Sequence, residues 1–267
     1  SGGSCHGVVF RIAPADVDSV AELRALLVTA NQRAALQVID AYAQSNAGTP
    51  PAVSDFGSAG IAGVDATNIG AINNALATAA VTGSGLTASS SSAAYATAQN
   101  HLQQVANAYN RILGEANGAS ADLTPGIDPS AADYAAIGAT AAAALSQSAR
   151  ELLNSSIGNL NFADVDTVAE IEALAAAAQH VVQAAAGNAT ALTQADLQRL
   201  GVDVSGMTAS QFATVANLIV ATADDGSAVN SIGELQSLVD GVINRIPSLS
   251  GLALSADTGI SAGDFVT

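Results

Sequence analysis

The fold is decided by the stretch DVDSVAEL, residues 16–23, because it carries a helix-start signal that returns along the chain. Its Ser19-x-x-Glu22 pattern is a capping box, in which the serine hydroxyl and the glutamate carboxylate each accept a hydrogen bond from a backbone N–H at the start of a helix. The glutamate also lies favourably near the positive end of the helix dipole. The stretch therefore predicts a helix that begins directly after Ser19.

The same signal is found at three further places. Residues 164–171 (DVDTVAEI) repeat it almost letter for letter, and residues 229–235 (VNSIGEL) are a looser copy. A degenerate copy without the glutamate opens at Ser92 and leads into the Ala-rich stretch 95–113. Internal similarity at such a period is typical of repeat proteins. We therefore expect four equivalent long helices, the last of which is closed by Pro247.

Two further landmarks are predicted inside each unit. A short helix with a C-terminal glycine is expected over 193–202, with counterparts over 54–61 and 121–127. A medium helix then follows, with Pro129 at the favoured first helical position of the middle copy. The medium helices are expected to begin at three N-cap residues, Asp65, Asp128 and Thr208, and Gln211 completes a capping box with the last of these.

These landmarks predict an all-α fold of tandem three-helix repeats, stacked as an elongated helical bundle or solenoid with short strand-like termini. A unit of roughly 65–75 residues has limited burial of its own, so neighbouring units are expected to share a core. The predicted segments are an N-terminal linker or strand (1–15), three helical repeats (16–91, a degenerate 92–163, and 164–228), the first helix of a partial fourth repeat (229–250) and an extended linker (251–267).

Composition and charge exclude several classes of function. The seven basic residues are all arginines and face 23 acidic ones, so the formal net charge is −16. Nucleic acid and anionic membrane surfaces both need a positive footprint, and we expect neither as a partner. Aromatic residues make up only 3% of the chain, which disfavours a large aromatic-lined substrate pocket. No apolar run reaches the roughly 18 residues of a membrane span, so no membrane insertion is expected.

The last residues carry a resemblance. Residues 254–267 (LSADTGISAGDFVT) resemble the opening of the immunoglobulin-like repeats of giant bacterial surface adhesins of the type I secreted class. The motifs TQADLQRLGV (193–202) and DDGS (224–227) are similar to motifs of helical repeats in such large extracellular proteins. The resemblance implies an extracellular location at the bacterial cell surface. The role it implies is to extend from the cell and hold a distal binding module.

A search for chemistry finds no catalytic or cofactor-binding constellation. The histidines His6, His101 and His180 are far apart, and no His-x-x-x-His or Cys-x-x-Cys pair exists to bind zinc. Cys5 beside His6 is an adjacent pair near a terminus, which is a poor geometry for catalysis. No Gly-x-Ser-x-Gly motif is present. We predict a protein that is not an enzyme and that carries no cofactor.

Pairs of aspartates precede three of the expected first helices, namely Asp16/Asp18, Asp164/Asp166 and Asp224/Asp225. Calcium takes several oxygen ligands, and the resemblance implies exposure to extracellular calcium. The twelve-residue calcium loop and the Gly-Gly-x-Gly-x-Asp repeat are both absent from the sequence. We therefore favour helix capping over a metal site for these carboxylates.

Three hypotheses of function follow. The favoured one is a structural spacer or stalk segment of a surface adhesin, with neighbouring domains of the same long chain as its partners. The alternative is a self-assembling subunit of an extracellular filament or surface layer, in which copies join through the strand-like ends 8–12 and 252–266. A helical protein-binding module is the third. Cys5 is able to form a disulfide between chains, although an incidental residue is the favoured interpretation.

Overall fold

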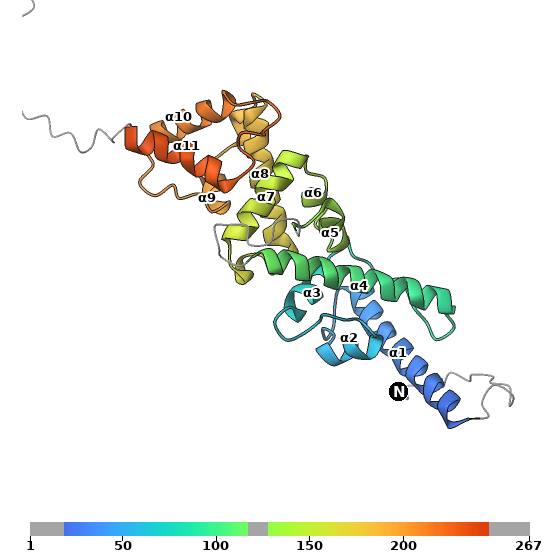
Figure 1. Ribbon diagram of the computed structural model, residues 1–267. Helices are drawn as coiled ribbons and strands as arrows, with labels where there is room; N and C mark the ends of the chain where they lie inside the picture. Colours follow the sequence, from blue (N-terminus) through green and yellow to red (C-terminus); the bar gives the residue numbers. More distant parts are fainter. Residues whose placement is uncertain (1–18, 117–127, 246–267) are drawn as a thin grey trace, which may run out of the picture.

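The computed structural model describes residues 19–116 and 128–245, whose regular elements are all helices and which contain no β-strand (Figure 1). The all-α prediction is thus confirmed for these ranges. The strand-like ends, Cys5, His6, Asp16, Asp18 and the expected short helix at 121–127 lie outside the described residues. The helices are α1 (Val20–Ser45), α2 (Val53–Ala59), α3 (Ile69–Leu76), α4 (Ser92–Glu115), α5 (Ala131–Ala136), α6 (Thr140–Ala143), α7 (Gln147–Asn159), α8 (Val168–Ala185), α9 (Gln194–Arg199), α10 (Ala209–Val220) and α11 (Ile232–Arg245), with 3₁₀ turns at Phe162–Asp164 and Ala189–Ala191.

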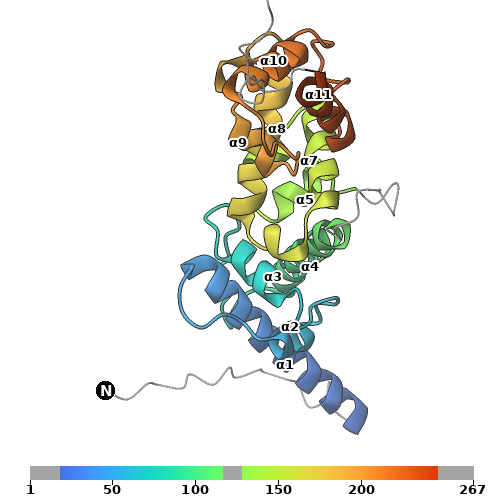
Figure 2. The ribbon, with the colours of Figure 1, turned by 90° about the vertical axis from the view of Figure 1, so that its left-hand side faces the viewer.

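The helices succeed one another along one long axis. Helices α1 to α3 lie at one end, α4 crosses the molecule next to them, α5 to α8 form the middle, and α9 to α11 lie at the other end (Figures 1 and 2). The buried apolar residues nevertheless form one continuous cluster. Alanine supplies much of it, as in α8, where Ala175, Ala178 and Ala185 are fully buried. Small side chains let the helix backbones approach closely at little cost in side-chain entropy.

The long helices begin where the capping boxes predict. At α1 the N–H of Glu22 donates to Ser19 Oγ (3.2 Å), and the N–H of Ser19 donates to the glutamate carboxylate (2.9 Å). The equivalent bonds of Thr167 at α8 are 3.3 and 3.0 Å, and those of Ser231 at α11 are 3.3 and 3.1 Å. The degenerate copy also opens a helix, α4, whose N-cap is Ser91. Local hydrogen bonding therefore sets these helix starts.

One predicted helix start is wrong. Asp128 is not an N-cap and Pro129 is not the first helical residue, because α5 starts after Ser130. The Ser130 hydroxyl accepts from the N–H of Asp133 (3.3 Å), and Asp133 accepts from the N–H of Ser130 (2.8 Å). This capping box displaces the expected start by two residues, and the carbonyl of Pro129 accepts a bond from Asn154 instead (3.0 Å).

The other two predicted starts differ in outcome. Thr208 caps α10 in a capping box with Gln211, as expected. Asp65 lies slightly ahead of α3, whose N-cap is Asn68. Its carboxylate accepts from the N–H groups of Thr67 (2.7 Å) and Asn68 (3.3 Å), so it caps the turn that leads into the helix. A hydrogen bond from the Thr67 hydroxyl (2.6 Å), followed by these backbone bonds, lowers the pKa of Asp65.

The short helices α2, α5 and α9 share one geometry. In each, an aspartate at the third helical position accepts a 2.8 Å bond from the backbone N–H of the N-cap residue, and a fully buried residue follows it. A glycine with positive φ then ends the helix, and the N–H after that glycine donates to the carbonyl of the buried residue at 2.9 to 3.0 Å. The buried residues are Phe56, Tyr134 and Leu197. Helix α5 is therefore a short helix, whereas the sequence predicted a medium one there.

Candidate functional site

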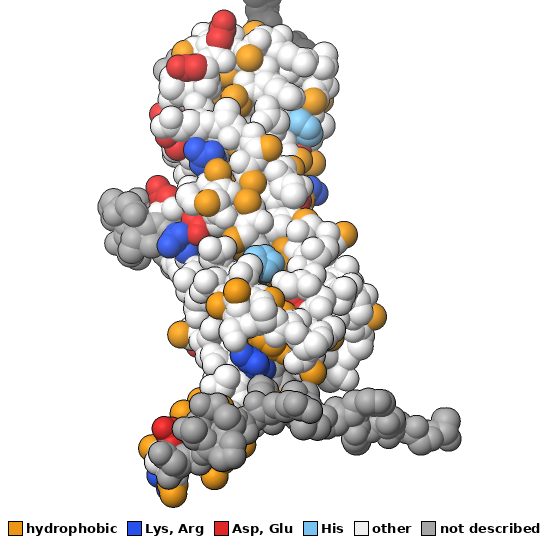
Figure 3. Space-filling model, turned by 90° about the vertical axis from the view of Figure 1, so that its right-hand side faces the viewer, with side chains coloured by type: hydrophobic (Ala, Val, Ile, Leu, Met, Phe, Trp, Pro, Cys, Tyr) orange, Lys and Arg blue, Asp and Glu red, His pale blue; other side chains and the backbone are white. Residues whose placement is uncertain are grey.

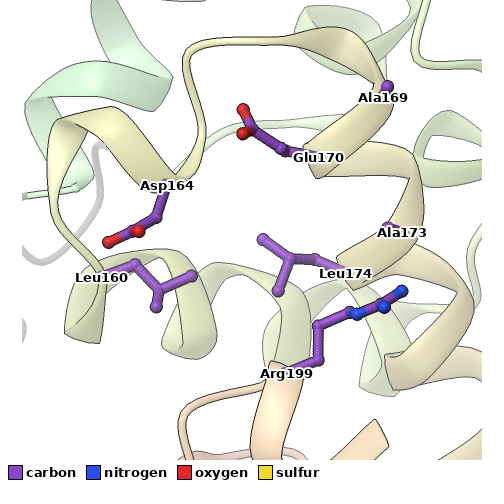
Figure 4. Close-up of a pocket in the computed structure, with 7 residues that line it drawn as sticks. All are labelled: Leu160, Asp164, Ala169, Glu170, Ala173, Leu174 and Arg199. Carbon is purple, nitrogen blue, oxygen red and sulfur yellow. The ribbon is translucent and has the colours of Figure 1, made fainter. Parts of the chain in front are cut away.

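A groove of about 430 Å³ lies beside the first half of α8 (Figure 4). It is lined by residues of the end of α7, the 3₁₀ turn before α8, α8 itself and the end of α9, namely Leu160, Asp164, Ala169, Glu170, Ala173, Leu174 and Arg199. The carboxylates of Asp164 and Glu170 lie at one side, and the Arg199 side chain runs toward Ala173 on the other (Figure 4). The groove thus holds both signs of charge around a small apolar floor.

The carboxylates in the groove already accept backbone hydrogen bonds. Asp164 is the last residue of the 3₁₀ turn, and its carboxylate accepts from the N–H of Asn161, which precedes the turn, at 3.0 Å. Glu170 accepts from the N–H and the hydroxyl of Thr167, at 3.0 and 2.7 Å, as part of the α8 capping box. Arg199 forms no ion pair with a described residue. Apart from these two carboxylates, the lining contains no histidine, cysteine, serine or threonine side chain.

A third carboxylate, that of Asp166, interacts with the two carboxylates of the groove. Partial burial raises the pKa of Asp166, and the charge and hydrogen bond of Glu170 and the charge of Asp164 add to that rise. The hydroxyl of Tyr109 is buried nearby without a hydrogen-bond partner among the described residues. Burial, followed by the charges of Asp166 and Glu170, raises the pKa of that hydroxyl well above its usual range. The cluster thus disfavours a further negative group.

Of the described aspartate pairs, Asp164 takes part in the capping box of the 3₁₀ turn, whereas Asp225 lies in a turn ahead of α11 and caps no helix. Asp225 accepts from the N–H of Ser227 at 2.9 Å, and this bond lowers its pKa. No group of three or more His, Cys, Asp or Glu side chains within 19–116 and 128–245 is arranged to hold a metal ion. Calcium binding by Asp164 and Asp166 therefore has no ready-made ligand set in the described part of the chain.

The described histidines lie on different helices, as the sequence predicts. His101 is half-buried on α4, and His180 is on α8. Nδ1 of His180 lies 3.2 Å from Oδ2 of Asp196, but the two do not meet hydrogen-bond geometry. Neither histidine is part of a metal-binding group among the described residues.

One face of the molecule shows how apolar and charged side chains are distributed on the surface. On the face in Figure 3, hydrophobic side chains form small separate groups and charged side chains are scattered between them. Within the described residues, no helix combines the length and the apolar character needed to cross a bilayer. The few charged side chains agree with the low charged fraction of 11% in the sequence.

The more regular feature is a set of polar joints between helices. The loop after α2 is fastened to α4, where the N–H of Ala62 donates to Gln103 Oε1 (2.8 Å) and Gln103 Nε2 donates back to the Ala62 carbonyl (3.1 Å). The loop after α9 is fastened to α11 by the same pair of bonds between Asp203 and Gln236, at 2.7 and 3.2 Å. Both glutamines also donate to a polar residue one turn later, at 2.8 Å. Sequence reasoning missed these joints, because nothing local marks one glutamine among many.

A second kind of joint holds the starts of α8 and α11. The N–H of Val168 donates to Asn74 Oδ1 of α3 (2.9 Å), and the N–H of Ile232 donates to Ser155 Oγ of α7 (3.0 Å). A helix leaves its first N–H groups without intrahelical partners, so an earlier helix satisfies one of them in each case. In both joints the donor is the N–H of the first helical residue.

Comparison with known proteins gives no relative: no protein-family model, no curated protein and no solved structure matches this chain.

Proposed function

We propose that this chain is a non-catalytic structural spacer, a stalk segment of an extracellular bacterial surface protein that supports adhesion. The observation that carries the proposal is the recurrence of one joint, Ala62–Gln103 and Asp203–Gln236, near opposite ends of an elongated molecule. A spacer needs the same connection at successive places, because a repeated connection propagates length in one direction.

The finer architecture belongs to the same proposal. Each predicted repeat contributes one long helix (α1, α4 or α8), one short helix (α2, α5 or α9) and one medium helix (α3, α7 or α10). Helix α11 then opens a fourth unit. In this arrangement the units are tandem repeats that stack as a solenoid, and each unit covers part of the next one's long helix.

The cellular side of the proposal rests on the sequence. The acidity of the chain and the resemblance of residues 254–267 to the start of an adhesin immunoglobulin-like repeat favour an extracellular surface protein. A strongly charged surface keeps such a molecule soluble and apart from its neighbours. The carboxylates of the groove beside α8 fit the spacer role, since both accept backbone N–H groups at helix starts.

Small-angle X-ray scattering of the full chain tests the spacer directly. A compact domain of this length would have a radius of gyration of about 18 Å, and we expect a clearly larger value with a long tail in the distance distribution. The double variant Gln103→Ala, Gln236→Ala removes both joints and is expected to shift the profile toward a bent or loosened shape. A compact profile of the unaltered chain would contradict the proposal.

The gene context tests the adhesin assignment. We expect further helical units with Ser/Thr-x-x-Glu starts before this segment and complete immunoglobulin-like repeats after it. A gene that encodes a short stand-alone protein without further repeats would exclude a stalk role.

A further inference from the structure

The first turns of α1 expose an apolar face that α8 and α11 bury. Val20, Leu23 and Leu27 lie on one side of α1 and are 67%, 58% and 60% exposed. The residues at the same distances from the N-caps of α8 and α11 are at most 6% exposed, and they are Val168, Ile171 and Ala175 in α8 and Ile232, Leu235 and Val239 in α11. Since the three helices share one start signal, the difference in exposure comes from what packs on each.

The covering of α8 shows which elements bury such a face. Helices α6 and α7 of the preceding predicted repeat, together with α3 of the repeat before that, pack against α8. The N–H of Ala141, in α6, donates to the carboxylate of Glu172 at 2.9 Å, and Asn74 of α3 accepts from the first N–H of α8. One polar contact therefore comes from each of the two preceding repeats.

The covering of α11 follows the same rule. Its first N–H donates to Ser155 of α7, which is two predicted repeats earlier, and Gln236 bonds the loop after α9, which is one repeat earlier. Glu172 and Gln236 lie at the same distance from their N-caps. Two independent helices of this chain thus bury the same face under the same kind of neighbours.

We propose that the face of Val20, Leu23 and Leu27, called the α1 face below, is a docking surface for a pair of helical units of the same kind as those that cover α8. This inference deepens the proposed spacer function and rests on it. The occupant places a medium helix and the loop that follows a short helix against α1. A side chain of that medium helix accepts a hydrogen bond from the N–H of Val20. A lone exposed apolar residue needs no explanation, but a face that is buried in both counterparts does.

The fifth residue after the N-cap binds a neighbouring segment in α8 and α11, and in α1 this residue indicates the chemistry of the occupant. Arg24 stands where α8 has Glu172 and α11 has Gln236. A guanidinium only donates hydrogen bonds, so it cannot accept from a loop N–H as Glu172 does. The loop that docks on α1 therefore presents a carbonyl or carboxylate oxygen to Arg24. In a chain with a net charge of −16, an acidic loop also matches the charge of this arginine.

A duplicated chain tests the proposal. Residues 1–163 are followed by residues 16–267, which places the downstream α1 where α8 stands in the natural chain. Leu23→Cys is introduced into the downstream copy of the duplicated chain and, separately, into the natural sequence 1–267, called the unextended chain below. Cys5 is replaced by Ser in both chains. We expect thiol labelling at position 23 to be slowed by roughly tenfold or more in the duplicated chain, because the preceding units cover the face.

Val28→Cys is the matched control. Val28 is 65% exposed, and its counterparts Ala176 and Asp240 are exposed as well, so this thiol should label equally fast in both chains. Equal labelling at position 23 in the two chains, with helical circular dichroism intact, would overturn the proposal. Protection of position 23 in the unextended chain that grows with concentration would also overturn it, in favour of a second copy as the occupant.

A second measurement guards against poor folding of the thiol variant. Leu23→Asp in the downstream copy is expected to lower the melting temperature of the duplicated chain, whereas the same change in the unextended chain has little effect. A similar response in both chains would count against docking. X-ray scattering tests the spacer proposal separately. If the unextended chain is elongated in solution but position 23 of the duplicated chain is not protected, the docking proposal fails and the spacer proposal stands.

Discussion

The hydroxyl of Tyr134 donates a 2.6 Å hydrogen bond to Oδ1 of Asn154, and both side chains are buried. The amide of Asn154 in turn donates to the carbonyl of Pro129 at 3.0 Å. In the first part of the chain Asn73 makes the equivalent bond to the carbonyl of Pro51 (2.9 Å). The residue in the place of Tyr134 is there Phe56, which has no hydroxyl, and Oδ1 of Asn73 is buried without a partner among the described residues.

This relationship predicts opposite effects for two reciprocal changes. Tyr134→Phe leaves the Asn154 oxygen buried and unpaired, and we expect a loss of about 1–3 kcal/mol in the free energy of unfolding. Phe56→Tyr supplies the missing donor to Asn73 and is expected to gain about 1 kcal/mol. Urea denaturation of both variants measures these changes. Two losses of similar size would mean that the pocket around Phe56 has no room for a hydroxyl.

Gly138 is predicted to be less replaceable than Gly201, although both end a short helix with positive φ, at 82° and 92°. A Cβ at Gly138 would meet Thr78 Oγ1 at 2.7 Å and Val81 at 3.0 Å, whereas one at Gly201 meets only Asn159 at 4.0 Å. Both alanine variants carry about 1–2 kcal/mol of left-handed backbone strain, and Gly138→Ala adds a steric clash on top. Thermal unfolding should therefore rank Gly138→Ala as the less stable variant. Equal melting temperatures would show that the segment around Thr78 yields freely.

Leu235 and Leu23 occupy the same position after a capping box but differ in burial. Leu235→Ala is expected to lower the free energy of unfolding by about 2–5 kcal/mol, as for a buried leucine. Leu23→Ala should change it by no more than about 0.5 kcal/mol, because that side chain is exposed. Chemical denaturation of the pair measures the difference. A large loss for Leu23→Ala in dilute solution would reveal a contact that the described residues do not make.

The raised pKa of Asp166 predicts that the contribution of this residue to the free energy of unfolding falls as the pH rises. Burial and Glu170 raise its pKa above the ordinary 3.8, so its contribution is fully present below 3.8 and is lost as the pH rises through the pKa of the folded state. The melting temperature of Asp166→Asn relative to the natural chain should therefore increase across that window and stay higher at neutral pH. A relative melting temperature that is independent of pH would contradict the raised pKa.

Asp133 supplies the control of opposite sign. Burial favours a higher pKa for Asp133, but hydrogen bonds from Ser130 and Arg111 and the charge of Arg111 outweigh it and lower the pKa below 3.8. The contribution of Asp133 is thus present above 3.8 and is lost as the pH falls through the lower pKa of the folded state. Asp133→Asn should destabilise the chain at neutral pH, and its deficit should shrink on acidification.

Calcium is expected to leave the melting temperature unchanged. A calcium ion takes about six to eight oxygen ligands, while the oxygens of Asp164, Glu170 and Asp225 already accept backbone N–H groups. Calorimetry in millimolar calcium and in chelator checks this expectation on the full chain, which includes Asp16 and Asp18. A rise in melting temperature with calcium that Asp164→Asn abolishes would instead establish a metal site.

The sequence by itself determined the helical class and the starts of α1, α8, α10 and α11, because a capping box is complete within four residues. The same local logic failed at Asp128, because the Ser130–Asp133 capping box starts α5 two residues later. No local signal could have favoured Gln103 or Gln236 over the other glutamines.

Only the tertiary structure decided which of the equivalent helix faces are buried. Leu23 and Leu235 follow the same start signal, yet one is exposed and the other is not. The reason is that burial comes from helices far away in the sequence. Helix α3, for example, contacts the start of α8 through Asn74, which is 94 residues from its partner Val168. Hydrogen bonds within one turn fix where a helix begins, whereas the packing of distant helices fixes what its face contacts.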